Sequence, residues 1–418
     1  MEQIKRDLYL NKLIERKENG SIKVITGIRR CGKSYLLFNL YYNYLLSIGV
    51  EKSRIVAVPL DDEEHEELLD SKKLGAYIKE RITDDNAYYI FLDEVQLCKG
   101  FEGVLNGLNR RSNLDIYVTG SNSKFLSSDI LTEFRGRGDE VRVYPLSFSE
   151  YLSAYQGDKY DAWLDYYTYG GLPLILTRKT DELKSKYLTD LFEKVYMDDI
   201  NERNHLRGDN IMDALVNMLA SAVGSLTNPT KLANTFKSSG ISNVSDKTIN
   251  SYIGHLIDAF MISKAQRYDI KGKKYISTPF KYYFTDVGLR NARLNFRQQE
   301  ENHLMENIIY NELLVRGFNV DVGLVEHNFK DENGRITRKQ LEVDFVCNKG
   351  NQRYYIQSAF SIPDNAKMQQ EQNSLIHISD SFKKIIIVKD NIKLWRNEEG
   401  IVIMGILEFL LNQNSLEL

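Results

Sequence analysis

A glycine-rich turn between a predicted strand and a predicted helix constrains this chain most. The β-prone run SIKVIT at 21–26 leads directly into GIRRCGKS at 27–34, and YLLFNLYYNYLL at 35–46 follows with apolar residues at helical spacing. A strand, GxxxxGKS and a helix in this order form the context that a P-loop requires. The glycines let successive backbone N–H groups face a phosphate at the start of the helix. The sequence therefore predicts an α/β fold whose N-terminal part is a parallel P-loop sheet.

The residue types in this turn suggest individual roles. Lys33 is expected to reach the β- and γ-phosphates of a nucleotide, and Ser34 to ligate Mg²⁺. The residues predicted to surround the nucleotide are Gly27, Ile28, Arg29, Arg30, Cys31, Gly32, Lys33, Ser34 and Tyr35. A thiol at a helix N-terminus tends towards a lowered pKa. We therefore hypothesise that modification of Cys31 blocks nucleotide binding; the alternative is a tolerated variable position.

A second motif follows further along the chain. The buried-type strand YYIFL at 88–92 ends in Asp93 and Glu94. A carboxylate after such a strand holds Mg²⁺ in P-loop enzymes, which is the role expected for Asp93. Glu94 is placed to orient and deprotonate an attacking water.

The next predicted strand, DIYVT at 115–119, runs into the polar turn GSNS at 120–123. Thr119, Ser121 and Asn122 compete for a contact with the γ-phosphate or the attacking water, and Asn122 is our candidate. A plain polar turn is the alternative.

Two arginines follow this turn, in EFRGRG at 133–138. Arg135 and Arg137 are candidates for fingers that stabilise transition-state charge, in their own chain or across a subunit interface. A solvated surface is the alternative, so the sequence leaves both the role and a homo-oligomer open.

Sequence runs along nearly the whole chain resemble one known group of proteins. The runs are YLNKLIERKENGSIKVITGIRRCGKSYLL, YYIFLDEVQ, YVTGSNSKFLSS, EFRGRGDEVRVYPLSFSEYL, YGGLP, KYYFTDVGLRNA, ENIIYNELLVRG, EVDFV and YYIQSAF. They are similar to bacterial and archaeal AAA+-superfamily ATPases that pair this P-loop module with a C-terminal domain of unknown function. The resemblance implies ATP and Mg²⁺ as ligands and an ATPase activity. It also implies Asp93 as the Mg²⁺-side acid, Glu94 as the catalytic base and Arg137, with Arg135 behind it, as the finger.

The middle of the chain contains a predicted winged helix-turn-helix. Two short helices, at 230–236 and 245–253, are followed by a β ribbon at 261–278. Lys and Arg outnumber Asp and Glu between residues 227 and 275. The side chains predicted to meet duplex DNA are Lys247, Thr248, Asn250 and Ser251 on the second helix and Lys271, Lys273 and Lys274 on the wing. A packing or protein-contact module is the alternative.

The C-terminal part has the layout of a metal-dependent nuclease of the PD-(D/E)xK kind. A predicted helix carries Glu306, a strand carries Asp344, and a second strand follows at 354–357. Nuclease chemistry needs several carboxylates around Mg²⁺ and a lysine. The second strand instead has Gln357 and Ala359, so we expect a restriction-endonuclease-like α/β domain that is inactive.

Length and composition set the remaining expectations. A chain of 418 residues is long enough for about three domains. We expect a P-loop ATPase domain at 1–155, a helical connector with a winged helix at 156–295, and a nuclease-like domain at 296–418. The N-terminus has no secretory signal, no apolar run is long enough for a membrane span, and three separated cysteines indicate a reducing cytoplasm.

The main functional interpretation is an ATPase whose nucleotide state controls how the other domains meet a partner protein. An ATP-regulated DNA-binding protein is one alternative, and a DNA nuclease is another.

Overall fold

The computed structural model describes residues 4–121, 136–206, 210–240, 244–297, 300–330 and 336–418. The chain forms two compact units. Unit 1 contains residues 1–146, 172–174 and 257–260, and unit 2 contains residues 147–171, 175–256 and 261–418. Each unit is described by itself below.

Unit 1 is built on a parallel sheet with the strand order β2-β3-β4-β1-β5. The strands are β1 (Ile22–Thr26), β2 (Ile55–Pro59), β3 (Tyr88–Asp93), β4 (Leu114–Gly120) and β5 (Gly138–Arg142). β1 lies in the interior of the sheet, and all five of its residues are buried. Because a parallel sheet is covered on both faces, its strands read as continuous apolar runs. The predicted parallel P-loop-type sheet is confirmed.

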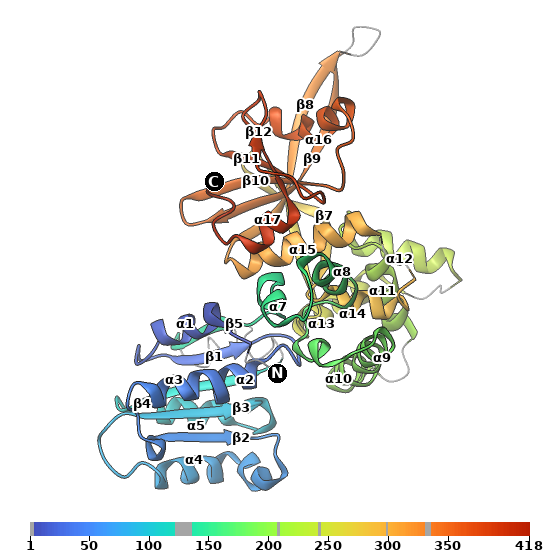
Figure 1. Ribbon diagram of the computed structural model, residues 1–418. Helices are drawn as coiled ribbons and strands as arrows, with labels where there is room; N and C mark the ends of the chain where they lie inside the picture. Colours follow the sequence, from blue (N-terminus) through green and yellow to red (C-terminus); the bar gives the residue numbers. More distant parts are fainter. Residues whose placement is uncertain (1–3, 122–135, 207–209, 241–243, 298–299, 331–335) are drawn as a thin grey trace. The chain divides into compact units, whose positions relative to one another are not determined.

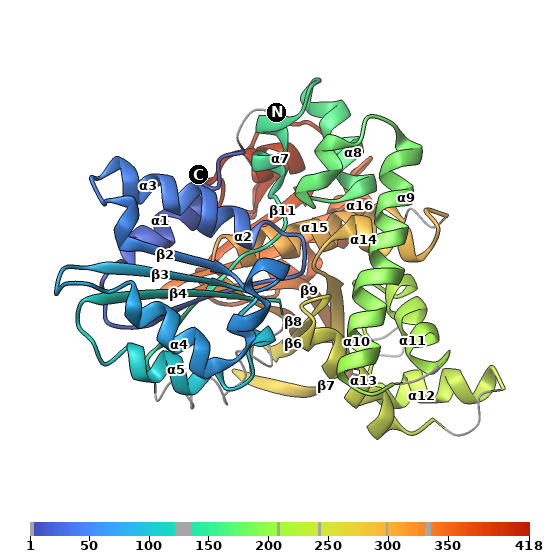
Figure 2. The ribbon, with the colours of Figure 1, turned by 90° about the horizontal axis from the view of Figure 1, so that it is seen from below.

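Helices cover both faces of this sheet, as Figure 2 shows, with α1 and α3 on one face and α4 and α5 on the other. Their bounds are α1 (Asp7–Glu15), α2 (Lys33–Tyr35), α3 (Tyr42–Ser47), α4 (Ser71–Glu80) and α5 (Phe101–Leu108), with a π-helical stretch at Leu36–Tyr41 between α2 and α3. Alternate strand residues such as Val24, Ile90 and Val118 share one core with Leu74 and Leu105 of α4 and α5. The alternation follows from the two-residue period of a strand.

Unit 2 begins with helices and continues into a mixed sheet (Figure 1). The helices are α7 (Phe148–Ala154), α8 (Lys159–Tyr169), α9 (Asp181–Leu191), α10 (Asp198–Arg203), α11 (Asn210–Ser221), α12 (Pro229–Ser238), α13 (Asp246–Asp258), α14 (Val287–Arg293), α15 (Glu301–Val315), α16 (Asn365–Ile376) and α17 (Ile406–Leu411). This arrangement agrees with the expected helical middle and α/β C-terminal part.

The sheet of unit 2 has the strand order β12-β13-β11-β10-β9-β8-β6-β7. Its strands are β6 (Ile262–Asp269), β7 (Lys274–Phe284), β8 (Asn319–Lys330), β9 (Ile336–Lys349), β10 (Gln352–Ala359), β11 (Lys383–Val388), β12 (Trp395–Arg396) and β13 (Val402–Gly405). The hairpin β6–β7, expected as the wing of a winged helix, is part of this sheet because Arg267–Asp269 pairs in parallel with Val322–Leu324 of β8. The pairing satisfies an otherwise open strand edge. One sheet therefore crosses the boundary that the sequence suggested at 295/296.

Two of the runs that carry the family resemblance meet at the start of α14. Asp286 Oδ1 accepts a hydrogen bond from Leu289 N (3.1 Å) and Oδ2 accepts one from Gly171 N (2.8 Å). A Cβ atom on Gly288 would lie 2.0 Å from Tyr169 O. The segments YGGLP and TDVGLRNA are thus held together by one carboxylate and a close backbone approach that only glycine allows.

This close approach predicts that Gly288→Ala lowers the free energy of unfolding by about 2 kcal/mol or more, because the methyl group would overlap a backbone oxygen. Gly254→Ala in α13 is the matched control, since a Cβ there meets nothing within 4 Å. Chemical denaturation of both variants is the measurement. Equal stabilities for the two variants would contradict the close packing at Gly288.

Candidate active site

The glycine-rich turn follows β1 and curls between the ends of β4 and β5. Gly27 has φ 143°, and a Cβ there would lie 2.0 Å from Val143 O, so the turn requires glycine at this position. Gly32 has φ 99° and directly precedes α2. The Nζ atom of Lys33 donates hydrogen bonds to Gly27 O (3.1 Å) and Ile28 O (3.2 Å). The turn is therefore wrapped around the lysine ammonium, as a phosphate-binding turn requires.

The two predicted Mg²⁺ ligands lie together beside this turn. Asp93 ends β3, and its carboxylate accepts hydrogen bonds from Thr119 Oγ1 and from the Ser34 side chain. Burial raises the pKa of the Asp93 carboxyl group, and these two hydrogen bonds oppose the rise. A hydroxyl and a carboxylate are hard oxygen ligands that fit Mg²⁺.

The predicted base, Glu94, lies immediately after β3 in a left-handed conformation with φ 46°. Its backbone N–H donates to Thr119 Oγ1 (2.9 Å), so one threonine side chain contacts both acidic residues. Ser121 Oγ donates to Glu94 Oε2 at 3.2 Å. Of the three candidates in the polar turn, Thr119 and Ser121 therefore lie at this site, whereas Asn122 is outside the described residues.

Sequence reasoning missed the residues that support the turn from the other side. Arg6 is buried, and its guanidinium donates to Cys31 O (3.0 Å) and Tyr144 O (2.7 Å). A Cβ placed on Gly32 would be 3.9 Å from Pro173 of the YGGLP run. The resemblance pointed to YGGLP and to YP at 144–145, but no pattern identified Arg6.

The lowered pKa expected for the Cys31 thiol is wrong. Its side chain is fully buried, and Sγ is 3.5 Å from Val143 O. Burial raises the pKa of the Cys31 thiol, and this effect exceeds the lowering by Lys33 and Arg6. The residue is a packed part of the turn and not an exposed thiolate.

Arg137 lies at the N-terminal ends of the parallel strands, whereas the turn lies at their C-terminal ends. Its carbonyl oxygen accepts a hydrogen bond from Ile22 N (2.7 Å) at the start of β1, whereas the turn begins after Thr26 at the end of β1. A strand rises about 3.3 Å per residue, so about 15 Å separates the start of β1 from the turn at its end. Arg137 is too far from the turn of its own chain to contact a phosphate bound there. Arg135 lies outside the described residues.

The predicted DNA-contact residues lie in unit 2 on α13 and on the turn between β6 and β7. Lys247, Asn250 and Lys273 are exposed, and Thr248 is half-buried. Ser245 Oγ accepts a hydrogen bond from Thr248 N (3.1 Å) and so caps the start of α13.

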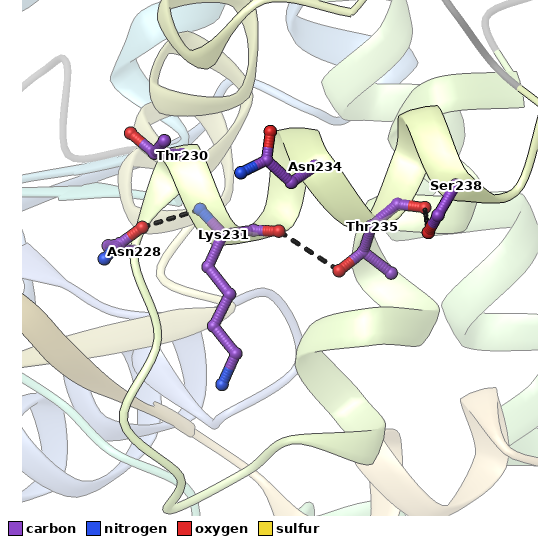
Figure 3. Close-up of a pocket in the computed structure, with 6 residues that line it drawn as sticks. All are labelled: Asn228, Thr230, Lys231, Asn234, Thr235 and Ser238. Carbon is purple, nitrogen blue, oxygen red and sulfur yellow. Dashed lines mark hydrogen bonds between the residues drawn. The ribbon is translucent and has the colours of Figure 1, made fainter.

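An open polar groove of about 510 Å³ lies on the neighbouring helix α12. Figure 3 shows its lining residues, which are Asn228, Thr230, Lys231, Asn234, Thr235 and Ser238. Asn228 caps the helix through Lys231 N (2.7 Å), and Thr235 Oγ1 donates to Lys231 O (3.1 Å). These bonds occupy part of the groove's polar groups within the helix itself.

The carboxylates of Glu306 and Asp344, which the nuclease pattern singled out, lie beside a lysine that sequence reasoning missed. Lys281 on β7 is buried, and its Nζ atom lies 2.8 Å from Glu306 Oε1, 2.8 Å from Glu342 Oε1 and 3.3 Å from Asp344 Oδ1. Burial alone would lower the pKa of the Lys281 ammonium, but the three carboxylates raise it above its ordinary value. Burial also raises the pKa of Glu306 to about 7.

The two second-strand positions do not complete this cluster. Ala359 lies in the apolar core with Leu375 and Ile386, where a lysine would be buried. Gln357 Oε1 lies 3.4 Å from Asp344 N and 3.5 Å from Ser374 Oγ. Over the described ranges, no group of three or more His, Cys, Asp or Glu side chains is arranged to hold a metal ion.

None of the helices in the described part of the chain combines the length and the apolar content that crossing a membrane needs.

Comparison with known proteins gives two family matches. Residues 19–152 match a family model described as an AAA domain, and residues 160–300 match one described as a domain of unknown function, DUF8612. Among solved structures, the ORC1 protein of Aeropyrum pernix, determined in complex with DNA, aligns with 70% of this chain and 92% of its own at 13% identity. Its TM-score of 0.30 is too low to support a shared overall fold.

Two relatives match along most of the chain. An uncharacterized protein of Methanocaldococcus jannaschii is 28% identical and covers 88% of this chain and 80% of its own. An uncharacterized protein of Haemophilus influenzae is 34% identical over 416 residues and covers 98% of both chains. With an AAA domain at 19–152 and this identity along nearly its whole length, the chain belongs to the same family as the Haemophilus influenzae protein.

Proposed function

We propose that the chain binds ATP with Mg²⁺ at the turn after β1 and hydrolyses it to ADP and phosphate. One observation carries the proposal: at the C-terminal ends of the parallel strands, the structure brings together Lys33, Ser34, Asp93 and Glu94. The AAA-domain match over 19–152 supports it. Mg²⁺, held through Ser34 and Asp93, would supply positive charge to the phosphate oxygens.

The residues of the chain would then act as follows. The Lys33 ammonium leaves the carbonyl groups of Gly27 and Ile28 and binds the β- and γ-phosphates. Glu94 accepts a proton from a water molecule while the water oxygen bonds to the γ-phosphorus. The bond from that phosphorus to the bridging oxygen breaks, and ADP leaves with the electron pair. Thr119 holds the Asp93 carboxylate and the Glu94 backbone in place through hydrogen bonds to both.

We further propose that nucleotide state controls how unit 2 meets a partner. Leu172–Leu174 belongs to unit 1, and the residue before it, Gly171, is bound by Asp286 in unit 2. Within unit 1, Pro173 lies beside Gly32, and Pro173 follows Gly171 by two residues in the sequence. A change at the turn that displaces Pro173 would therefore act on the segment of chain that leads into unit 2.

The ATPase proposal predicts that Glu94→Gln binds ATP but turns it over about 10²- to 10⁴-fold more slowly, because the base is lost while the phosphate contacts remain. Lys33→Ala should lose ATP binding, because the turn then lacks the ammonium group that would bind the phosphates. Phosphate release and equilibrium binding of ATP are the measurements. A Glu94→Gln chain that hydrolyses ATP at the parental rate would rule out the base assignment.

We propose that Arg137 acts as a finger in the site of a second copy of the chain. Its position at the far edge of the sheet supports a role across a subunit interface. On this proposal a homo-oligomer is the active form.

This arrangement predicts complementation between two inactive variants. Arg137→Ala keeps its own turn but offers no finger, and Lys33→Ala offers a finger but has no working turn. Mixing the two should raise ATP turnover above that of either variant alone, measured at concentrations that favour assembly. The finger assignment fails if Arg137→Ala alone hydrolyses ATP at the parental rate, or if the mixture stays inactive.

A second candidate function is contact with duplex DNA through α13 and the β6–β7 turn. The exposed positions of Lys247, Asn250 and Lys273 support it, as does the polar groove on α12. We propose that the chain does not cleave the DNA. A lysine ammonium has three N–H donors, and Lys281 has three carboxylates within reach, so none is left for a scissile phosphate. We therefore propose an inactive nuclease-like module.

This second candidate predicts duplex binding that weakens steeply with salt, because phosphate contacts release counterions. Lys247→Ala with Lys273→Ala should reduce the salt slope, whereas Lys186→Ala on the exposed surface of α9 is the control. The same samples with Mg²⁺ or Mn²⁺ should leave plasmid DNA intact. Salt-independent binding would contradict phosphate contact, and cleavage that is lost in Asp344→Ala would contradict the inactive module.

A further inference from the structure

We propose that Gln96 is a positioning residue that holds the Glu94 carboxylate in the orientation needed to accept a proton from the attacking water. The inference rests on the proposed ATPase and assigns it one more residue. Gln96 lies in the short helix Val95–Leu97, which begins directly after Glu94. The left-handed backbone of Glu94, with φ 46°, followed by one helical turn brings the two side chains back to each other.

Two donors bind the same oxygen of this carboxylate. Gln96 Nε2 and Ser121 Oγ both donate to Glu94 Oε2, the latter at 3.2 Å. Neither of these bonds uses Oε1. A carboxylate with one oxygen fixed by two hydrogen bonds presents its other oxygen in a defined direction, which is the geometry a general base needs.

The orientation of the Gln96 amide is set by Glu94. The amide oxygen Oε1 of Gln96 is buried and has no hydrogen-bond partner among the described residues. A buried acceptor without a partner is unfavourable. The reversed amide would place its oxygen against the Glu94 carboxylate, where two negative atoms repel. The donor-to-carboxylate contact therefore determines this side chain's orientation more than the pairing of its own oxygen does.

The same carboxylate is also connected to the phosphate turn. Arg29 Nε donates to Ser121 Oγ at 3.5 Å, and Ser121 in turn donates to Glu94. Ser121 thus links the base to the turn, while Gln96 contacts it from its own helix. The two donors fix Glu94 from different segments of unit 1.

The test compares Gln96→Met, which keeps the volume but removes the donor, with the parental chain. We expect kcat for ATP hydrolysis to fall about 10- to 100-fold, as for a misplaced catalytic group, with KM for ATP and the melting temperature nearly unchanged. Leu97→Ala is the matched control, because Leu97 is an exposed neighbour in the same helix turn and should leave kcat unchanged. An unchanged kcat in Gln96→Met would overturn the proposal.

A double-mutant cycle separates positioning from an independent effect. In a Glu94→Gln background, Gln96→Met should cause no further loss, because Gln96 acts only through the carboxylate. A second loss that multiplies the first would overturn the assignment. The parental chain and Lys33→Ala are assayed first: no Lys33-dependent turnover in the parental chain counts against the ATPase, whereas normal parental turnover with an insensitive Gln96 counts against this inference alone.

Discussion

The hydrogen bonds from Lys33 to the carbonyl groups of Gly27 and Ile28 are the interaction on which the site of this protein depends. A buried ammonium needs acceptors, and the turn supplies two of them by curling back on itself. That curl requires glycine where the backbone passes Val143. It also points the start of α2 at the space where a phosphate would lie, so that one set of contacts organises the turn and leaves the lysine ready to exchange carbonyl groups for phosphate oxygens.

The sheet around the turn explains why acidic and polar side chains gather there. β1, β3 and β4 are parallel, so their carboxyl ends lie next to one another. Asp93 and Glu94 follow β3, while Thr119 and Ser121 come from the end of β4. The same topology places the start of β5, and with it Arg137, at the amino ends of these strands. Ser121 and Arg137 follow one another along the chain, with the start of β5 after them, yet they lie at opposite ends of the parallel strands.

Sequence reasoning predicted the parts of this site that short motifs encode. The strand, turn and helix around Lys33 and the acidic end of β3 were correct, because each depends on residues that are neighbours in the chain. It failed where contacts come from distant segments. Arg6 carries no motif, and the burial of Cys31 depends on Val143, so a local argument about helix termini gave the wrong pKa direction.

Unit 2 shows the same limit more strongly. The alignment of a nuclease pattern onto β9 and β10 placed the missing lysine at Ala359, yet the lysine that meets Asp344 comes from β7, at position 281. No local spacing could indicate this, because the contact depends on how the hairpin β6–β7 joins the sheet through β8. The hairpin itself was predicted, but its strand partner was not.

A structure of the Glu94→Gln chain bound to ATP and Mg²⁺ would test the central claim most directly. The account predicts that the phosphates lie against the turn at 27–34, that Lys33 Nζ has moved from the carbonyl oxygens of Gly27 and Ile28 to the β- and γ-phosphates, and that Ser34 and Asp93 lie at the metal. Nucleotide bound elsewhere, or a Lys33 that keeps both carbonyl contacts with ATP present, would contradict it.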